Sequence, residues 1–388
     1  MTDVITFGLA RMHVESGERR AFLPKMVADL EKRGVLVHLE YGYGAGMGLT
    51  EGDYLKVAPG VRFVPYQEVF KQQYVLVLRC PADEDLKMME TGSCLISMMH
   101  YPTRPQRVEL LRSLEIEAVS LDSLKEDSGR RMIENMRSVA WNGLEAGFHV
   151  LRRTYPSPGM EDPKRAPIHA TVLGVGAVGV HAVQAACRYG DEKLWVKLAE
   201  RGTPGVQVTA IEYDLAGQED IMHDILARTD LLVDATQRRD TSVPVVPNEW
   251  IAWLPEHAVI VDLAVDPYTL DAEPPVVRGV EGIPQGNLDQ YVFPADDPKW
   301  DKLVPESIPS KHRRTAVTCY SWPGVHPEAC MQHYAHQLEP LIFHLVKKGY
   351  DGLSIEGDFI ERALYRATLK AWLQDEADKS ARVQKGSE

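Results

Sequence analysis

The stretch TVLGVGAVGV, residues 171–180, decides the fold of this chain. Its glycines, Gly174, Gly176 and Gly179, form the pattern G-x-G-x-x-G directly after an apolar run, and the helix-like run VHAVQAACRYG follows. Such glycines let the chain turn sharply, let backbone amides approach a pyrophosphate and let the helix pack close to the strand. The context predicts a strand–turn–helix unit that binds a dinucleotide. The alternative is a tight turn in an α/β domain that binds no nucleotide.

An acidic residue at the end of the next strand normally accepts hydrogen bonds from the adenosine ribose. The run VQVTAIEYD supplies Glu212, with Asp214 as a second candidate, and we prefer Glu212 because the apolar run stops there. The spacing from Gly179 exceeds the usual ~20 residues, so we expect an extended helix or an insertion around residues 191–205. A carboxylate disfavours a 2′-phosphate, so the cofactor predicted is NAD rather than NADP. An ordinary solvated strand end is the alternative for Glu212.

Apolar runs typical of buried strands alternate with helix-like stretches on both sides of this unit. One series falls between residues 4 and 120 and a second begins near Ile168; their strand-like runs are VITFGLA, VLVHLE, YVLVLR, CLISMM and EAVSL, then HATVLGVG, VQVTAIE, DLLVDA and AVIVDLA. Such alternation predicts parallel sheets flanked by helices. We therefore expect an α/β fold with two Rossmann-like, doubly wound parallel-sheet domains.

The segment between the two series sets the expected domain boundaries. Residues 130–152 carry apolar side chains at roughly helical spacing without a proline, and predict one long helix that joins the domains. We expect residues 1–140 to form a substrate-binding, catalytic domain, completed by C-terminal helices in residues 328–388. Residues 141–327 are expected to form the Rossmann domain that binds NAD. The proline-rich stretch 286–314 predicts a long irregular loop, able to cover a cleft.

The composition excludes several classes of protein. A formal net charge of -13 argues against a nucleic-acid partner. The five cysteines are odd in number and contain no Cys-x-x-Cys pair, so we expect a reducing compartment and no disulfide framework. No apolar run approaches the ~20 residues that span a bilayer, and the first residues lack the basic flank of a signal peptide. We therefore predict a cytoplasmic protein with no membrane partner, no nucleic-acid partner and no metal site.

Several patches in one order resemble a known family. They are ERRAFLPKMVADLEKRGVLVHLEYGYGAG, VLRCP and LISMMHYP, then VLGVGAVG, VTAIEYD, VIVDLAVD and WPGVHPE. Together they are similar to alanine dehydrogenases, lysine-forming saccharopine dehydrogenases and the soluble subunit of nicotinamide nucleotide transhydrogenase. The resemblance runs over most of the chain and is more specific than the glycine pattern alone. It implies an NAD-dependent oxidoreductase of the alanine dehydrogenase kind, acting on a small amino acid or the matching keto acid.

The resemblance also implies two substrate-binding arginines. Arg20, in GERRAFLP, resembles the family's arginine that grips the substrate carboxylate, and a guanidinium suits this task because its planar fork makes two parallel hydrogen bonds. The alternative is that Arg19 and Arg20 form a basic loop. Arg79, in VLRCP, stands where alanine dehydrogenases carry a substrate-binding lysine. This departure leaves the substrate open, because arginine binds a carboxylate but does not donate a proton near neutral pH.

Three further residues match positions that act in the family. His100, in SMMHYP, matches the catalytic histidine, and an imidazole exchanges protons near neutral pH during imine steps. Asp266, in VIVDLAVDP, matches an aspartate that assists catalysis, whereas Asp262 has the position of a structural residue. Ser321, just before WPGV, resembles a cofactor-contacting asparagine. A hydrogen-bonded structural role is the alternative for His100.

The expected reaction is hydride transfer between the nicotinamide ring and a carbon bearing nitrogen. A saccharopine or opine-type dehydrogenase is the alternative within the fold, favoured by the DSGRR patch at residues 127–131. A non-catalytic nicotinamide-binding module is the alternative of another class. The oligomeric state stays open: alanine dehydrogenases suggest a homo-oligomer, and saccharopine dehydrogenases need not assemble in that way.

Overall fold

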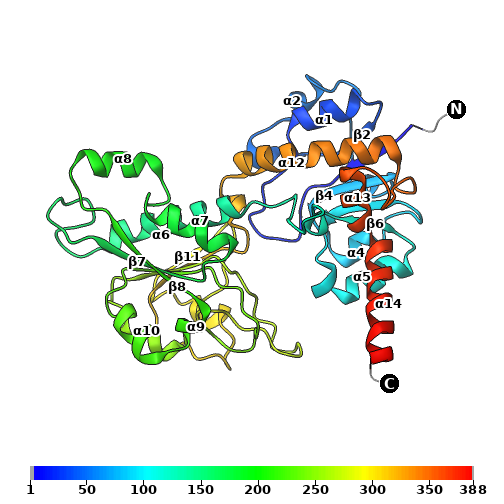
Figure 1. Ribbon diagram of the computed structural model, residues 1–388. Helices are drawn as coiled ribbons and strands as arrows, with labels where there is room; N and C mark the ends of the chain where they lie inside the picture. The colour runs from blue at the N-terminus through cyan, green and yellow to red at the C-terminus, as the bar shows by residue number, and fades with distance from the viewer. Residues whose placement is uncertain (1–3, 387–388) are drawn as a thin grey trace. The chain divides into compact units, whose positions relative to one another are not determined.

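The computed structural model describes residues 4–386 and divides the chain into two compact units. The first unit is made of two stretches of chain, up to Asn135 and from Pro327 onward, and the second is the continuous stretch Met136–His326. Within the described residues, each unit contains one six-stranded sheet with helices around it (Figure 1). The predicted α/β class with two mostly parallel sheets is therefore confirmed.

The sheet of the first unit is parallel throughout, with strand order β3-β2-β1-β4-β5-β6. Successive side chains of a strand point to opposite faces. In β4, Leu76 and Leu78 accordingly enter one buried cluster, whereas Val75 and Val77 enter another. Both faces are therefore covered, as a doubly wound parallel sheet requires. The strands are β1 (Thr6–Leu9), β2 (Leu36–Glu40), β3 (Arg62–Val64), β4 (Tyr74–Arg79), β5 (Cys94–Met98) and β6 (Glu117–Ser120).

Helices from both ends of the chain cover this sheet. Helix α1 contacts both β2 and α12, so the orange α12 lies beside the blue α1 in Figure 1. Leu338, Leu341 and Leu345 of α12 belong to the same buried cluster as Leu76, so the C-terminal helices complete the core of the first unit. The helices are α1 (Pro24–Glu31), α2 (Glu51–Leu55), α3 (Tyr66–Val69), α4 (Asp83–Leu86), α5 (Pro105–Ser113), α12 (Pro327–Lys348), α13 (Phe359–Arg366) and α14 (Leu369–Gly386).

The sheet of the second unit has strand order β11-β12-β10-β9-β7-β8 and is parallel except for the edge strand β11. Helix α6 packs tightly on it because Gly143 and Gly147 lack side chains. A Cβ at these positions would lie 2.3 Å from Leu263 Cδ2 and 2.4 Å from Val261 Cγ2. The strands are β7 (Ile168–Leu173), β8 (Val206–Ile211), β9 (Leu231–Asp234), β10 (Val259–Asp262), β11 (Val292–Phe293) and β12 (Thr315–Thr318).

The helices of the second unit correct one expectation and refine two others. Helix α6 begins at Met136 and not at residue 130, because Ile133 is buried in the core of the first unit and Arg131 forms a β-bridge with Lys125. A separate helix, α8, accounts for the long spacing before Glu212. The stretch 286–314 is mostly irregular and holds only β11 and α11. The helices are α6 (Met136–Thr154), α7 (Ala177–Ala186), α8 (Glu192–Glu200), α9 (Tyr213–Ala216), α10 (Glu219–Leu226) and α11 (Trp300–Leu303).

Short 3-10 helices occupy several connections in both units. They are η1 (Ala45–Met47), η2 (Tyr101–Thr103), η3 (Leu121–Ser123), η4 (Asn248–Trp253) and η5 (Trp322–Val325). No helix within residues 4–386 is long and apolar enough to cross a membrane.

Each strand order contains one topological switch point, where the chain leaves one side of a strand and returns on the other. It lies between β1 and β4 in the first sheet and between β7 and β9 in the second. Ligands of open α/β sheets bind outside the carboxyl ends of the strands at such points. The loops that follow β1, β4, β7 and β9 are therefore where functional side chains are expected.

Packing at Gly8, inside β1, gives a test of this fold. A Cβ on Gly8 would lie 2.0 Å from the backbone oxygen of Val69, so we expect Gly8→Ala to lower the free energy of unfolding by about 1–3 kcal/mol or more. Gly52→Ala, in α2, is the matched control, because its Cβ would make only an ordinary 3.5 Å contact with Thr50 Oγ1. Urea unfolding followed by circular dichroism measures both. Equal midpoints for the two variants would contradict the packing described here.

Candidate functional site

The glycine turn after β7 has the geometry that its sequence predicts. Gly174 has a φ of 82°, which side chains rarely adopt, and a Cβ on Gly179 would lie 1.9 Å from the backbone oxygen of Gly174. Nothing lies within 4 Å of the position of a Cβ on Gly176, which is the N-cap of α7. The turn is therefore closed on the protein side and open at the helix amino terminus. That arrangement fits a pyrophosphate, because amides and helix dipole favour an anion there.

Glu212 lies beside this turn. It is the first residue after β8, its side chain is exposed, and its Oε1 accepts a hydrogen bond of 2.8 Å from the backbone N–H of Val175. The structure thus brings the predicted ribose-binding carboxylate next to the predicted phosphate-binding turn. Its role toward a ribose stays a prediction.

Two aspartate–arginine pairs occupy the loops after β9 and β10. Asp262, the last residue of β10, is buried and binds the buried guanidinium of Arg278. Asp266, four residues further along, is partly exposed, and its Oδ2 accepts a hydrogen bond of 2.7 Å from Arg238 Nη2. This geometry agrees with a structural part for Asp262 and leaves Asp266 as the aspartate that a ligand can reach.

A third aspartate, Asp234, is fully buried at the end of β9, opposite Asp262 in register. Its Oδ1 accepts hydrogen bonds from the backbone N–H and the hydroxyl of Thr236, at 3.0 and 2.7 Å. Its Oδ2 has no hydrogen-bond partner and fills the space beside Gly279, where a Cβ would lie 2.1 Å from it. Burial, followed by the charge of Asp262, raises the pKa of Asp234 to about 7. The sequence analysis did not single out this residue.

Ser321 lies in the loop after β12, directly before η5, and is buried. Its backbone oxygen accepts a hydrogen bond of 2.8 Å from the N–H of Gly324, which closes the turn at WPGV. The residue therefore lies near the carboxyl edge of the second sheet, where Gly174 and Asp266 also lie. Contact with a cofactor stays a prediction for Ser321.

In the first unit, His100 follows β5 and is held by Asp122. His100 has a φ of 52°, a backbone conformation that is rare outside glycine and concentrates at functional sites. Its side chain is exposed; its Nδ1 lies 3.4 Å from Asp122 Oδ2, and its backbone N–H donates to Asp122 Oδ1 at 3.1 Å. Asp122, in turn, accepts a hydrogen bond of 2.8 Å from the hydroxyl of Ser120. A carboxylate at Nδ1 favours the tautomer that leaves Nε2 for exchange with a ligand.

Asp122 is ionised in this setting. Burial alone would raise the pKa of Asp122, but hydrogen bonds from His100, the charge of His100 and the Ser120 hydroxyl together lower it. The residue is a functional candidate that sequence reasoning missed. The signal that could have found it is its position, because it lies two residues after β6 at the same carboxyl edge as His100.

Arg20, the predicted carboxylate-binding residue, is buried and already paired. Its Nε donates to Glu18 Oε1 at 2.9 Å, its Nη2 binds Glu18 Oε2, and the side chain of Glu18 is also buried. Burial alone would lower the pKa of Arg20, but the hydrogen bonds and charge of Glu18 outweigh it and raise this pKa. The guanidinium fork is thus occupied by a carboxylate of the protein. The neighbouring Arg19 is the exposed arginine of the pair.

Arg79, at the end of β4, lies at the switch point of the first sheet. It forms an ion pair with Glu15 and lines a small hollow together with the loop that follows β1. Cys80 also lines this hollow, and burial raises the pKa of its thiol to about 12, so that this group stays protonated. Arg79 ends β4, and His100 lies two residues after the end of the neighbouring β5, which places both predicted residues at one edge of the sheet.

The DSGRR patch has a structural use in this chain. Asp127 forms ion pairs with Arg362 and Arg366 of α13, at 2.5 and 2.9 Å. Hydrogen bonds to both arginines, against a smaller effect of burial, lower the pKa of Asp127 to about 2. The DSGRR patch, which favoured an opine-type dehydrogenase in the sequence analysis, therefore binds helix α13 within the first unit.

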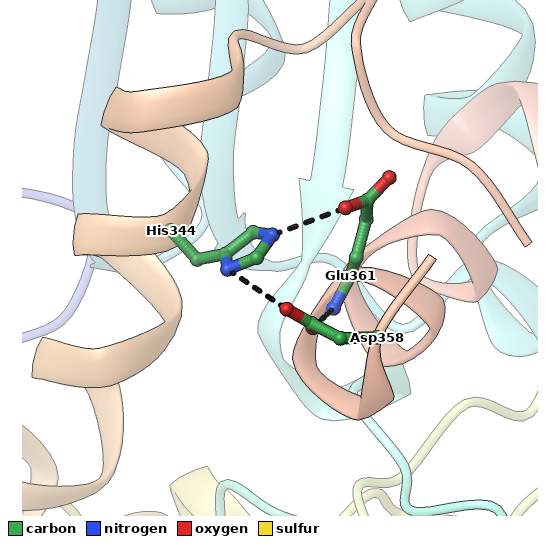
Figure 2. Close-up of side chains that lie close together, drawn as sticks. All are labelled: His344, Asp358 and Glu361. Atoms are coloured by element: carbon green, nitrogen blue, oxygen red, sulfur yellow. Dashed lines mark hydrogen bonds and ion pairs between the residues drawn. The ribbon is translucent and has the colours of Figure 1, made fainter. Parts of the chain in front are cut away.

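One cluster of metal-binding residue types occurs within residues 4–386: His344, Asp358 and Glu361 (Figure 2). His344 Nε2 lies 3.4 Å from Glu361 Oε2 and its Nδ1 lies 3.9 Å from Asp358 Oδ2. Asp358 caps α13 by accepting from the N–H of Glu361, and Lys348 Nζ lies 3.0 Å from Glu361 Oε2. These contacts join α12 to α13 and explain why the three residues lie together. The Lys348 ammonium is the cation of the cluster.

Two domain models of one known family match the chain. The alanine dehydrogenase/PNT N-terminal domain matches residues 11–140 and the C-terminal domain of the same family matches residues 145–268. The alanine dehydrogenase of Mycolicibacterium smegmatis is 23% identical over 257 residues, which are 64% of this chain and 69% of that protein. The NAD(P) transhydrogenase subunit alpha of Haemophilus influenzae is 22% identical over 183 residues, which are 46% of this chain and 35% of that protein.

Solved structures show the same fold. An L-alanine dehydrogenase superposes with a TM-score of 0.69 at 19% identity and covers 94% of both chains. A transhydrogenase from Sinorhizobium meliloti superposes with a TM-score of 0.60 at 16% identity, over 88% of this chain and 94% of that one. These likenesses confirm the two-unit α/β fold.

The buried Asp234 gives a prediction on pH. Its pKa rises from an ordinary 3.8 in the unfolded chain to about 7 in the folded one, so the folded state holds the extra proton between these values. The contribution of Asp234 to the free energy of unfolding therefore falls as pH rises from about 4 to about 7, by up to about 1.4 kcal/mol per pH unit. We expect Asp234→Asn to flatten this dependence, measured by urea unfolding between pH 5 and 8. Parallel curves for the variant and the original chain would refute the prediction.

Proposed function

We propose that this chain, which belongs to the alanine dehydrogenase/PNT family, is an NAD-dependent dehydrogenase of a small amino acid. The reaction would move a hydride between the nicotinamide ring and the carbon that bears the amine or imine nitrogen. The observation that carries the proposal is the pair formed by exposed His100 and buried Asp122 at the carboxyl edge of the first sheet. Such a pair is suited to acid–base catalysis.

In this proposal, His100 moves protons. With Asp122 at Nδ1, its Nε2 can take a proton from the attacking water and give it to the departing amine, and the reverse reaction would move the same proton in the opposite direction. The negative charge of Asp122 would stabilise the protonated imidazole while it holds that proton. The role of Asp122 is therefore to position and stabilise His100, without contact to the substrate.

Asp266 and Arg79 are proposed to hold the two charged ends of the substrate. The carboxylate of Asp266 would bind the ammonium group and stabilise the cationic iminium. Arg79 would bind the substrate carboxylate through its planar fork. Arg20 is a second candidate for that carboxylate. Both arginines have a carboxylate partner in the protein, but the side chain of Arg20 is 3% exposed and that of Arg79 is 36% exposed, so Arg79 is the residue that we propose to bind the substrate.

The cofactor would lie along the glycine turn of the second unit. Gly174, Gly176 and Gly179 would approach the pyrophosphate, Glu212 would bind the ribose hydroxyls, and Ser321 is the proposed further contact. The bound nicotinamide supplies or accepts the hydride. The open side of Gly176 supports this assignment, because a phosphate can approach the backbone there.

A substrate screen tests the function. NADH oxidation is followed with ammonia plus pyruvate, glyoxylate or 2-oxoglutarate, and separately with lysine plus 2-oxoglutarate. We expect turnover with ammonia and a small 2-oxo acid. His100→Ala and Asp266→Asn should lower that turnover by about 100-fold or more and leave the affinity for NADH nearly unchanged.

The exposed His223→Ala serves as the control histidine variant and should keep full turnover. Turnover only with lysine and 2-oxoglutarate would establish the opine-type alternative. NADH binding without turnover on any pair would establish a non-catalytic module. Normal turnover of His100→Ala would remove His100 from its assigned role.

The assignment of Glu212 predicts that NADH binds more tightly than NADPH, because the carboxylate accepts ribose hydroxyls and repels a 2′-phosphate. Glu212→Gln should narrow the difference between the two affinities. Isothermal titration calorimetry measures both affinities, with the exposed Glu200→Gln as the control variant. Equal affinities in the original chain, or tighter NADPH, would show that Glu212 does not read the ribose.

A further inference from the structure

Arg238 donates four hydrogen bonds through its two terminal nitrogens. Its Nη1 donates to the backbone oxygens of Val243 and Thr241 at 2.9 and 3.3 Å, and its Nη2 donates to the backbone oxygen of Val277. The same Nη2 donates to Asp266 Oδ2 at 2.7 Å. One guanidinium thus fastens the loop after β9 to the loop after β10.

The two partners of this ion pair differ in exposure. The side chain of Arg238 is 5% exposed, whereas that of Asp266 is 30% exposed. The three backbone oxygens are neutral, whereas Asp266 is a carboxylate in direct contact with the buried guanidinium of Arg238, and it balances the charge there. A buried guanidinium without its carboxylate is strongly unfavourable. The pair therefore holds the carboxylate of Asp266 at one place.

The backbone before Asp266 is fixed by a second arginine. Val265 has a φ of 57°, which is strained for a β-branched residue. Its N–H donates to Asp262 Oδ1 at 2.9 Å, and Asp262 is bound through Oδ2 by the buried Arg278. Arg278 therefore supports the main chain of this loop through Asp262, while Arg238 holds the side chain of Asp266.

We propose that Arg238 is the positioning residue for Asp266: it binds Oδ2 and thereby presents Oδ1 as the one oxygen that accepts from the nitrogen of the substrate. The proposal rests on the function proposed above and adds the residue that aims its aspartate. The two aspartates at and after the end of β10 thus differ in the arginine that binds them and in their role. Asp262, bound by Arg278, stabilises the fold. Asp266, held in place by Arg238, binds the substrate.

The charged groups around this pair fit that division. Asp234 faces Asp262 and lies near enough to Asp266 for each charge to raise the pKa of Asp234, so this acid holds its proton until about neutral pH. Arg278 binds Asp262, and Arg238 binds Asp266. Asp266 is thus left with Arg238 as its counter-ion and one oxygen for a ligand.

Kinetics of Arg238→Met and Arg238→Lys test the proposal. We expect Arg238→Met to lower kcat by about 100-fold, the scale of a misplaced reacting group, with the affinity for NADH changed less than twofold. Arg238→Lys keeps the charge but loses the fork, and should be intermediate, near a 10-fold loss. The double variant Arg238→Met/Asp266→Asn should be no slower than Asp266→Asn alone. Arg313→Met, which breaks the separate ion pair with Asp301, is the matched control and should keep its kcat.

Thermal unfolding supplies a readout that needs no turnover. Because Asp266 balances a buried charge, Asp266→Asn alone should lower the unfolding temperature more than the double variant does. A kcat for Arg238→Met within threefold of the original chain, or additive losses in the double variant, would overturn the proposal. If Arg238→Met does not fold, Arg238→Lys decides: a folded variant with original kcat overturns it, and a 10-fold loss at unchanged NADH affinity supports it. Absence of turnover by the original chain would instead refute the proposed function, and the unfolding comparison would still test the ion pair.

Discussion

Parallel strands of one sheet all end at the same edge, and the arrangement of this chain depends on that constraint. Residues far apart in sequence meet because each lies within a few residues of the end of a strand. In the first unit, Arg79 is the last residue of β4, and His100 and Asp122 each lie two residues after the end of β5 and β6. In the second unit, the glycine turn, Glu212 and Asp266 follow β7, β8 and β10. A change that reversed or shifted one strand would remove its side chain from the edge without altering any residue of the candidate site.

The charged side chains at these edges form ion pairs, and the pairs differ from one another in how deeply their two members are buried. Glu18 with Arg20, and Asp262 with Arg278, are buried on both sides and therefore stabilise loops. Asp122 with His100, and Arg238 with Asp266, have one buried and one more exposed member. Under the proposed function, the buried partner of such a pair fixes the position and the more exposed partner binds the ligand.

Local patterns predicted much of this molecule. The glycine turn, the strand-to-helix alternation and the place of Glu212 depend on neighbours in sequence, and the structure contains them. The start of α6 was misplaced because Met132 and Ile133 continue the helical spacing, although they pack in the other unit. Arg20 matched a family motif, but it is buried against helix α12, where Cys330 Sγ accepts a hydrogen bond of 3.9 Å from Arg20 Nη1. No local pattern reports such a distant contact. Arg238 lies 28 residues from Asp266, so its part had no signal in the sequence.

The first unit is assembled from two stretches of chain separated by the whole of the second, and this has a consequence for synthesis on the ribosome. The second unit is continuous, so all of its strands and helices are available once residue 326 has been made. The first unit, in contrast, still lacks the apolar face of α12 at that stage, including Leu338 and Leu345 from its core. Its sheet must wait with one face partly uncovered while the second unit folds, since domains generally fold as units during translation. A chain that stops prematurely after residue 326 would therefore carry a folded second unit and an incomplete first unit with exposed apolar surface. Chaperones and proteases recognise such surface.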